Sequence, residues 1–144
     1  MKLSTRGRYA ARALLDLALH QNNGPTSLKE IAARQNVSPK YLDQILSQLR
    51  NAGIVRAMRG SKGGFSLAVE PDNLTLLKVI TVMEGRTAIV DCVGEGAICE
   101  RAEECVTRDV WADVGTAIDQ VLGAITIGDL VERTKNRSNP PCPR

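Results

Sequence analysis

The residues best suited to chemistry are three cysteines in the segment DCVGEGAICERAEEC, which we call the cysteine loop (residues 91–105). Cys92, Cys99 and Cys105 are separated by six and five residues, and Gly94 permits a sharp bend. Thiolates are soft ligands that suit iron–sulfur clusters, zinc or copper(I). Zinc sites usually contain close C-x2-C pairs, which this loop lacks. The long spacers therefore favour an iron–sulfur cluster, with cluster-free thiol sensing and a zinc site as the alternatives.

No obvious fourth ligand accompanies these thiols. The single histidine, His20, falls at the end of a predicted helix, where an ordinary, partly exposed role is the simpler interpretation. Cys142 lies in a proline-rich tail and reaches the loop only if that tail folds back. A solvent molecule or a small thiol is another option, as is a loop carboxylate such as Asp91, Glu100, Glu103 or Glu104.

The composition is that of one globular domain with an appendage, since 24% of the 144 residues are charged and 43% are hydrophobic. An apolar run near the start is interrupted by Arg8, Arg12 and Asp16, which argues against a signal peptide or a membrane span. We therefore expect a cytoplasmic protein with no membrane partner. In that compartment, neighbouring cysteines more often serve metal or redox chemistry than structural disulfides.

The charge is divided unevenly along the chain. Residues 1–69 contain eleven Lys/Arg and three Asp/Glu (net +8), whereas residues 70–144 contain eight and thirteen (net −5), which together give +3. This asymmetry predicts an anionic partner for the first half, and double-stranded DNA is the leading candidate. A merely solvated basic surface is the alternative.

The first half has the pattern of a winged helix-turn-helix. Apolar spacing predicts helices over 9–20 and from Ser27 to about residue 35, where Ser27 and Glu30 form a capping box. A third helix follows from Pro39, capped by Ser38 and ending near Gly53, and it turns Leu42, Ile45, Leu46 and Leu49 to the core. Two strand-like runs then flank the glycine-rich segment GSKGG, as in a hairpin. The glycines do not form a phosphate-binding loop, because no GKS or GKT motif occurs and a strand follows.

The start of the third helix and the tip of the hairpin are the expected DNA contacts. The first turns of a recognition helix meet base edges, where Gln44 suits adenine and Lys40 suits guanine or phosphate. Asp43 accepts from cytosine, repels wrong sites, or is simply solvated and paired with an arginine. An arginine at the tip suits a narrow minor groove, and Lys2, Arg6 and Arg8 add phosphate contacts. The predicted interface is Ser38, Lys40, Tyr41, Asp43, Gln44, Arg59, Ser61 and Lys62.

The second half is predicted to be helical. A buried helix over 74–84 links the winged domain to the cysteine loop, and a helix of about 20 residues follows it. That helix carries the apolar stripe Val106, Val110, Val114, Ala117, Ile118 and Val121, which a second copy of the chain would cover, with Trp111 packing in the interface. Thr126 caps a short final helix.

We therefore expect a mainly α protein with a small β-hairpin, and a long C-terminal dimerisation helix. The predicted divisions are a winged domain (1–70), a linking helix (71–90), the cysteine loop (91–105), the dimerisation and final helices (106–135) and a flexible tail (136–144).

Several stretches resemble the IscR-like iron–sulfur cluster regulators, whose wider group also contains NsrR and CymR. They are MKLSTRGRYA followed by LLDLAL, SPKYLDQILSQLRNAGIV, RGSKGGF and the three-cysteine loop, and the resemblance spans about residues 1–135. It implies a dimeric bacterial transcription factor in which Cys92, Cys99 and Cys105 hold an iron–sulfur cluster, and the weak fourth position leads us to expect the 2Fe-2S type. Cluster status would then select promoters, including those of cluster-biogenesis genes.

The chain departs from this family at the fourth ligand. IscR-like members have histidine three residues after the last cysteine, and an NsrR-like member can use a carboxylate near the N-terminus. Here these positions are Arg108 and Arg8, and arginine has no free lone pair to offer a metal.

The resemblance leaves two other regulators open: a nitric oxide sensor, and a thiol- or partner-controlled repressor of cysteine metabolism without a cluster. An enzyme is not expected, because the chain has no C-x-x-C pair, one histidine and no cysteine matched with a base. No small-molecule substrate is expected either.

Overall fold

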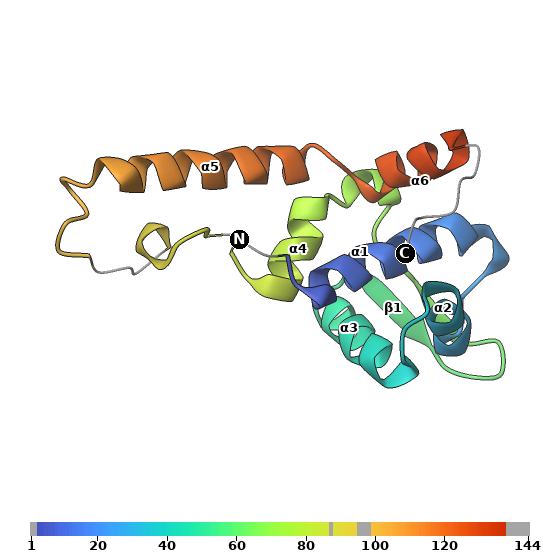
Figure 1. Ribbon diagram of the computed structural model, residues 1–144. Coiled ribbons are helices and arrows are strands. Elements are labelled where there is room, and N and C mark those ends of the chain that lie inside the picture. Colours follow the sequence, from blue (N-terminus) through green and yellow to red (C-terminus); the bar gives the residue numbers. More distant parts are fainter. Residues whose placement is uncertain (1–2, 87, 95–98, 138–144) are drawn as a thin grey trace.

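The computed structural model describes residues 3–86, 88–94 and 99–137 (Figure 1). The fold is mostly helical with one antiparallel hairpin, as predicted. Short 3-10 turns connect several elements (Gln21–Asn23, Pro71–Asn73 and Asp91–Val93). The helices are α1 (Thr5–His20), α2 (Leu28–Gln35), α3 (Pro39–Asn51), α4 (Leu76–Glu84), α5 (Val106–Gly123) and α6 (Ile127–Asn136), and the strands are β1 (Val55–Met58) and β2 (Gly64–Leu67).

Side-chain caps set the starts of the helices. Helix α1 begins earlier than the predicted range 9–20, because the Ser4 hydroxyl accepts a hydrogen bond from the Gly7 amide at 3.2 Å and so starts the first turn. The Ser27–Glu30 capping box that was predicted for α2 is present. A second capping box, between Thr126 and Asp129, starts α6. These caps are local in sequence, which explains why the residue pattern locates them well.

The hairpin is tied to the rest of the winged domain by its second strand. Val55 pairs with Leu67 and Met58 with Gly64, so the strands are shorter than the predicted runs. Phe65 then exchanges two backbone hydrogen bonds with Thr26, of 2.9 and 2.8 Å. Gly64 has φ 151, and a Cβ there would collide with the Thr26 carbonyl. Glycine therefore allows β2 to approach the segment before α2.

The hydrophobic core lies where α1 meets α2, α3, α4 and α6. The predicted inward stripe of α3 is confirmed, since all four of its members are buried. In α4, Val79, Ile80 and Met83 are buried, whereas Leu77 and Val82, also predicted to be buried, are only partly covered. The completely buried side chains, with no more than 1% exposure, include Leu14, Ile31, Leu42, Ile45, Leu46, Leu49, Val79 and Ile127.

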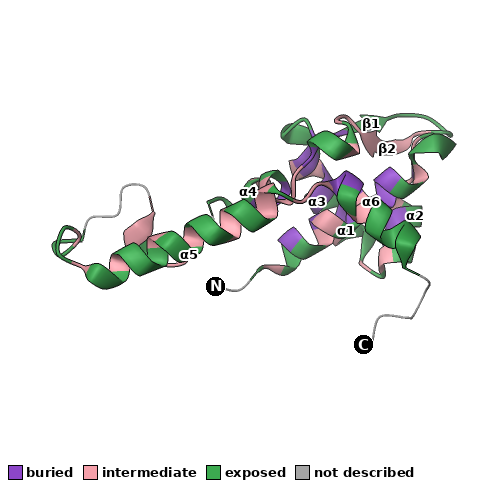
Figure 2. Ribbon diagram, turned by 90° about the horizontal axis from the view of Figure 1, so that it is seen from above, coloured by how far each residue is buried: buried purple, intermediate pink, exposed green. Residues whose placement is uncertain are grey.

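Helix α5 lies outside this core. None of its residues is buried. Figure 2 shows it as a helix of exposed and intermediate residues that extends from the body, by which we mean α1 to α4, the hairpin and α6. Its C-terminal end is attached through backbone hydrogen bonds of 2.8 Å from Leu76 N to Ile125 O and from Ile127 N to Leu74 O. Among the described residues, no helix combines the length and the apolarity needed to cross a bilayer.

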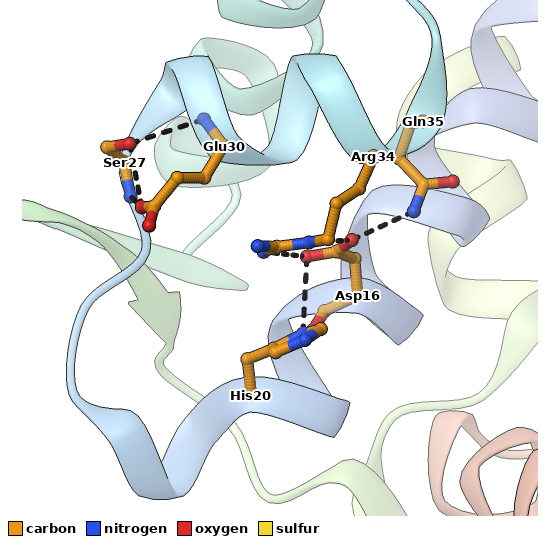
Figure 3. A network of polar contacts seen from close by, with 6 residues as sticks. All are labelled: Asp16, His20, Ser27, Glu30, Arg34 and Gln35. Atoms are coloured by element: carbon orange, nitrogen blue, oxygen red, sulfur yellow. Dashed lines mark hydrogen bonds and ion pairs between the residues drawn. The ribbon is translucent and has the colours of Figure 1, made fainter.

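A buried carboxylate joins α1 to the end of α2 (Figure 3). Asp16, 3% exposed, accepts hydrogen bonds from Arg34 Nη2 at 2.6 Å, Arg34 Nε at 2.9 Å and Gln35 Nε2 at 2.9 Å. His20 Nδ1 lies 2.8 Å from the Asp16 carbonyl. Burial raises the pKa of Asp16, but the hydrogen bonds from Arg34 and Gln35 outweigh it and leave the pKa below its ordinary value.

We predict that Asp16→Ala lowers the free energy of unfolding at pH 7 by about 1–3 kcal/mol, because it removes the partner of Arg34 and Gln35. The lowered pKa means that the carboxylate stabilises the fold above pH 3.8, its ordinary value, and that this contribution disappears as the pH falls through the folded-state pKa. Urea titrations at several pH values should show the difference from the parent protein shrinking in acid. Asp43→Ala, at an exposed carboxylate, is the control. An equal loss of unfolding free energy in that variant would contradict the stabilising role of the buried Asp16.

Candidate nucleic-acid interface and cysteine loop

The first turns of α3 present the predicted polar residues to solvent. Ser38, Lys40, Asp43 and Gln44 are all exposed, and Pro39 occupies the first helical position. The Ser38 oxygen accepts a hydrogen bond from the Tyr41 amide at 3.2 Å, which caps the helix and leaves the hydroxyl hydrogen available to a phosphate. This end of α3 therefore has the donors and the positive helix terminus that an anionic partner requires.

Tyr41 differs from its exposed neighbours. It is half-buried, and its ring meets the Tyr9 ring edge-on with centroids 6.1 Å apart. The Arg12 guanidinium lies 5.0 Å from the centre of the Tyr9 ring and donates to the Gln35 carbonyl at 2.8 Å. The Tyr41 ring thus packs α3 against α1, which the sequence pattern did not reveal.

Asp43 forms no ion pair with any residue that the structure describes, so the interpretation of a carboxylate paired with a nearby arginine has no support in this chain. It stays exposed between Lys40 and Gln44. The predicted roles of Asp43, which are accepting from cytosine, repelling wrong DNA sites or simple solvation, stay predictions.

The hairpin tip supplies a second basic surface. Arg59, Ser61 and Lys62 are exposed in the loop between β1 and β2. Gly60 has φ 109, a conformation that favours glycine and keeps the tip narrow. Of the further phosphate contacts predicted near the N-terminus, Arg8 is exposed, Lys2 lies outside the described residues, and Arg6 donates to the side chain of Gln48.

The three cysteines lie on the segment that joins α4 to α5. Cys92 is in a 3-10 turn and half-buried, Cys99 is exposed, and Cys105 is the half-buried N-cap of α5. The Thr107 hydroxyl, 3.2 Å from the Cys105 Sγ, lowers the pKa of this thiol, and the Arg108 backbone amide lowers it further. Cys105 therefore has more thiolate character than an ordinary cysteine.

Arg108 closes the base of the cysteine loop. Its Nε donates to the Cys92 carbonyl at 3.0 Å, which links the first turn of α5 to the first cysteine. The position that carries a histidine in IscR-like members thus holds a hydrogen-bond donor that positions the backbone. Because this contact joins residues far apart in the loop, the sequence pattern gave no signal for it.

The structure bears on the options for a fourth ligand without selecting one. Within the described ranges, no three His, Cys, Asp or Glu side chains converge as a metal site, so the ligation predicted for the three cysteines stays a prediction. His20 is engaged with Asp16 at the end of α1, which Figure 1 shows on the side opposite the loop. Cys142 lies outside the described residues, and the four loop carboxylates named above as candidates, which are Asp91, Glu100, Glu103 and Glu104, are exposed.

Comparison with known proteins decides the family. The profile of the Rrf2 family, described as an iron-dependent transcriptional regulator, matches residues 3–133. The chain belongs to the Rrf2 family. Its relatives include the transcriptional regulators IscR of Aliivibrio salmonicida (37% identical, covering 96% of this chain and 85% of the relative) and CymR of Bacillus subtilis (40%, 93% and 92%).

Solved structures of Rrf2 regulators have the same architecture. The structure of CymR, the global cysteine regulator of B. subtilis, superposes with a TM-score of 0.78 at 41% identity, covering 92% of this chain and 98% of that one. T. potens IscR gives a TM-score of 0.78 at 36% identity, covering 97% and 94%. The winged-helix prediction is therefore confirmed, and this Rrf2 protein is a DNA-binding transcriptional regulator. Its relatives are named as regulators, not as enzymes.

We predict that two substitutions in the interface change DNA binding in different ways. Gln44→Ala should weaken operator binding by about 1–3 kcal/mol and relax the preference at one base pair. Lys62→Ala should weaken binding to all sequences and reduce the slope of log affinity against log salt by about one. Fluorescence anisotropy at several salt concentrations measures both effects. Lys135→Ala on α6 is the control, and an equal effect there would contradict the proposed face.

Proposed function

We propose that this Rrf2 regulator binds operator DNA as a homodimer and selects promoters according to whether its cysteine loop holds an iron–sulfur cluster. The observation that carries the proposal is the position of the thiols. Cys92, Cys99 and Cys105 occupy the connection between α4, which packs in the winged body, and α5, which leaves it. A change at this connection alters how α5 is held relative to the DNA-reading surface, which is the set of predicted DNA contacts on α3 and the hairpin tip.

The donor set of the loop fits such a cluster. Three thiols lie on an accessible segment, and the lowered pKa of Cys105 favours the thiolate that binds a soft metal. Cys92, Cys99 and Cys105 would hold the cluster, with a loop carboxylate as the fourth ligand. When bound, the cluster supplies a group whose loss or oxidation reports on iron supply and oxidants. Because Arg108 cannot ligate, we propose a weakly held corner and a labile, 2Fe-2S type cluster.

The proposed dimer rests on the outer face of α5. The exposed fractions there are 76% for Val106, 49% for Val110, 39% for Val114 and 60% for Val121, and Trp111 is 41% exposed. Such a continuous apolar surface on one helix is typical of an interface. A second copy would cover it and would place two recognition helices on one duplex.

Cluster-free control by thiol chemistry is the second candidate. The lowered pKa of Cys105 favours it, because a thiolate reacts with oxidants more readily than a thiol. The similarity to CymR, described as a global cysteine regulator, also supports it. In this alternative the same loop responds to oxidation of its thiols.

Purification without oxygen should distinguish the two candidates. With a cluster, the protein absorbs broadly in the visible and contains iron and inorganic sulfide, while the joint change of Cys92, Cys99 and Cys105 to Ala removes the colour and alters promoter choice. His20→Ala, at a residue engaged with Asp16, should keep the colour. Colourless parent protein that contains no sulfide yet binds operators fully would contradict the cluster proposal and favour thiol control.

A charged substitution in the apolar stripe of α5 tests the proposed dimer interface. Val114→Glu should raise the dissociation constant of the dimer at least about tenfold, because it places a charge in an apolar interface. Analytical ultracentrifugation measures this change. Thr116→Glu adds the same charge at an exposed residue with no member of the apolar stripe three or four positions away, and should leave association nearly unaltered. Equal behaviour of the two variants would rule out the stripe as the interface.

A further inference from the structure

Gln48 shares one side of α3 with two predicted DNA contacts but has a different environment. Lys40, Gln44 and Gln48 follow at intervals of four residues, which places them along the same side of the helix. Lys40 and Gln44 are exposed, whereas Gln48 is half-buried where α3 meets α1 and α4. Its place on α3 thus joins the DNA-reading face to the interior of the body.

Both polar groups of the Gln48 side chain are engaged. Nε2 donates to the Val82 carbonyl at 2.7 Å, and Oε1 accepts from Arg6 Nη2. Val82 lies in the last turn of α4, whose final carbonyls have no partner within the helix. One side chain therefore connects α3 to the start of α1 and to the end of α4.

The same turn of α4 is fixed a second time from α1. Glu84 Oε1 accepts hydrogen bonds from the Ser4 amide at 3.0 Å and from the Ser4 hydroxyl at 2.8 Å. Gly7 is buried beside this carboxylate, and a Cβ there would collide with it. The end of α4 is thus held against α1 and α3 at close range, so a displacement of this turn is transmitted to both helices.

The segment that leads to the cysteine loop starts directly after this junction. Gly85 ends α4 with φ 79, and its amide donates to the Thr81 carbonyl at 2.9 Å. Only a short stretch of chain separates Val82 from Cys92. This stretch is the covalent connection between the cysteine loop and the turn of α4 that accepts the hydrogen bond from Gln48.

We propose that Gln48 is a positioning residue that couples the cysteine loop to the DNA-reading end of α3. Its bond to the Val82 carbonyl converts a shift of the last turn of α4 into a shift of the recognition helix. Coupling between two sites is reciprocal, so DNA bound to α3 also alters the state of the loop. The inference rests on the proposed function only in taking this loop as the sensing element, and it applies to cluster and thiol control alike.

Thiol alkylation in the cluster-free protein tests this coupling. The protein is stripped with a chelator, reduced, and treated with iodoacetamide with and without a saturating operator duplex obtained by in vitro selection. Mass spectrometry then gives the alkylation rates of Cys92, Cys99 and Cys105. In the parent protein, DNA should change at least one rate about fivefold or more, the lower end of ordinary coupling between sites. In Gln48→Leu, which keeps the size but removes both hydrogen bonds, this change should be lost.

Two further variants separate coupling from mere support of the fold. Gln21→Leu carries the same substitution at an exposed residue of the 3-10 turn after α1, outside the predicted DNA interface, and it should retain the full change in alkylation. Gln48→Glu keeps an acceptor for Arg6 but loses the donor to Val82, so it should lose the change even if Gln48→Leu fails to fold. A parent protein whose thiols ignore DNA, or Gln48 variants that respond like the parent, would overturn the proposal. Because no cluster is present, these results are independent of the cluster experiment.

Discussion

The packing of α1 is the constraint on which the rest of the structure depends. Ala10, Ala13 and Leu14 are completely buried, and the helix contacts α2, α3, α4 and α6. Small side chains at the first two positions let the surrounding helices approach closely, so the body has little freedom to change one interface alone. The recognition helix α3 and the helix α4, which leads to the cysteine loop, thus both pack against α1. The buried Asp16 also fixes the direction of α2 on α1.

The body and the arm formed by the cysteine loop and α5 differ in how they are stabilised. The body contains the buried residues, whereas α5 contains none. Segments with few buried contacts open at low free-energy cost, and sensing elements are drawn from such segments. In the proposed function the body reads DNA and the arm responds, and the turn around Val82 and Glu84 is one place where the two meet, besides the attachment at the C-terminal end of α5.

The sequence was most informative where the determining interactions are local. The stripe Leu42, Ile45, Leu46 and Leu49, the capping box at Ser27 and the cap at Thr126 are set within a few residues, and each is present as predicted. Contacts between distant residues were not predictable in this way. Gln48 and Val82 are 34 positions apart, and Ser4 and Glu84 are 80 apart, so no spacing rule connects them. For the same reason the contact between the rings of Tyr41 and Tyr9 was not predictable, and the DNA contact of Tyr41 stays a prediction.

The closed base of the cysteine loop has an evolutionary consequence. Arg108 holds the Cys92 carbonyl at one end of α5, and Leu74 pairs with Ile127 at the other. None of the described residues between Cys92 and Cys105 belongs to the hydrophobic core of the body. Lengthening a loop between fixed ends adds only a small entropic cost, because that cost grows with the logarithm of its length. Under the proposed function, insertions and exchanged donor atoms in this stretch would leave the fold intact, and a lineage could acquire a new stimulus while keeping its inherited operators.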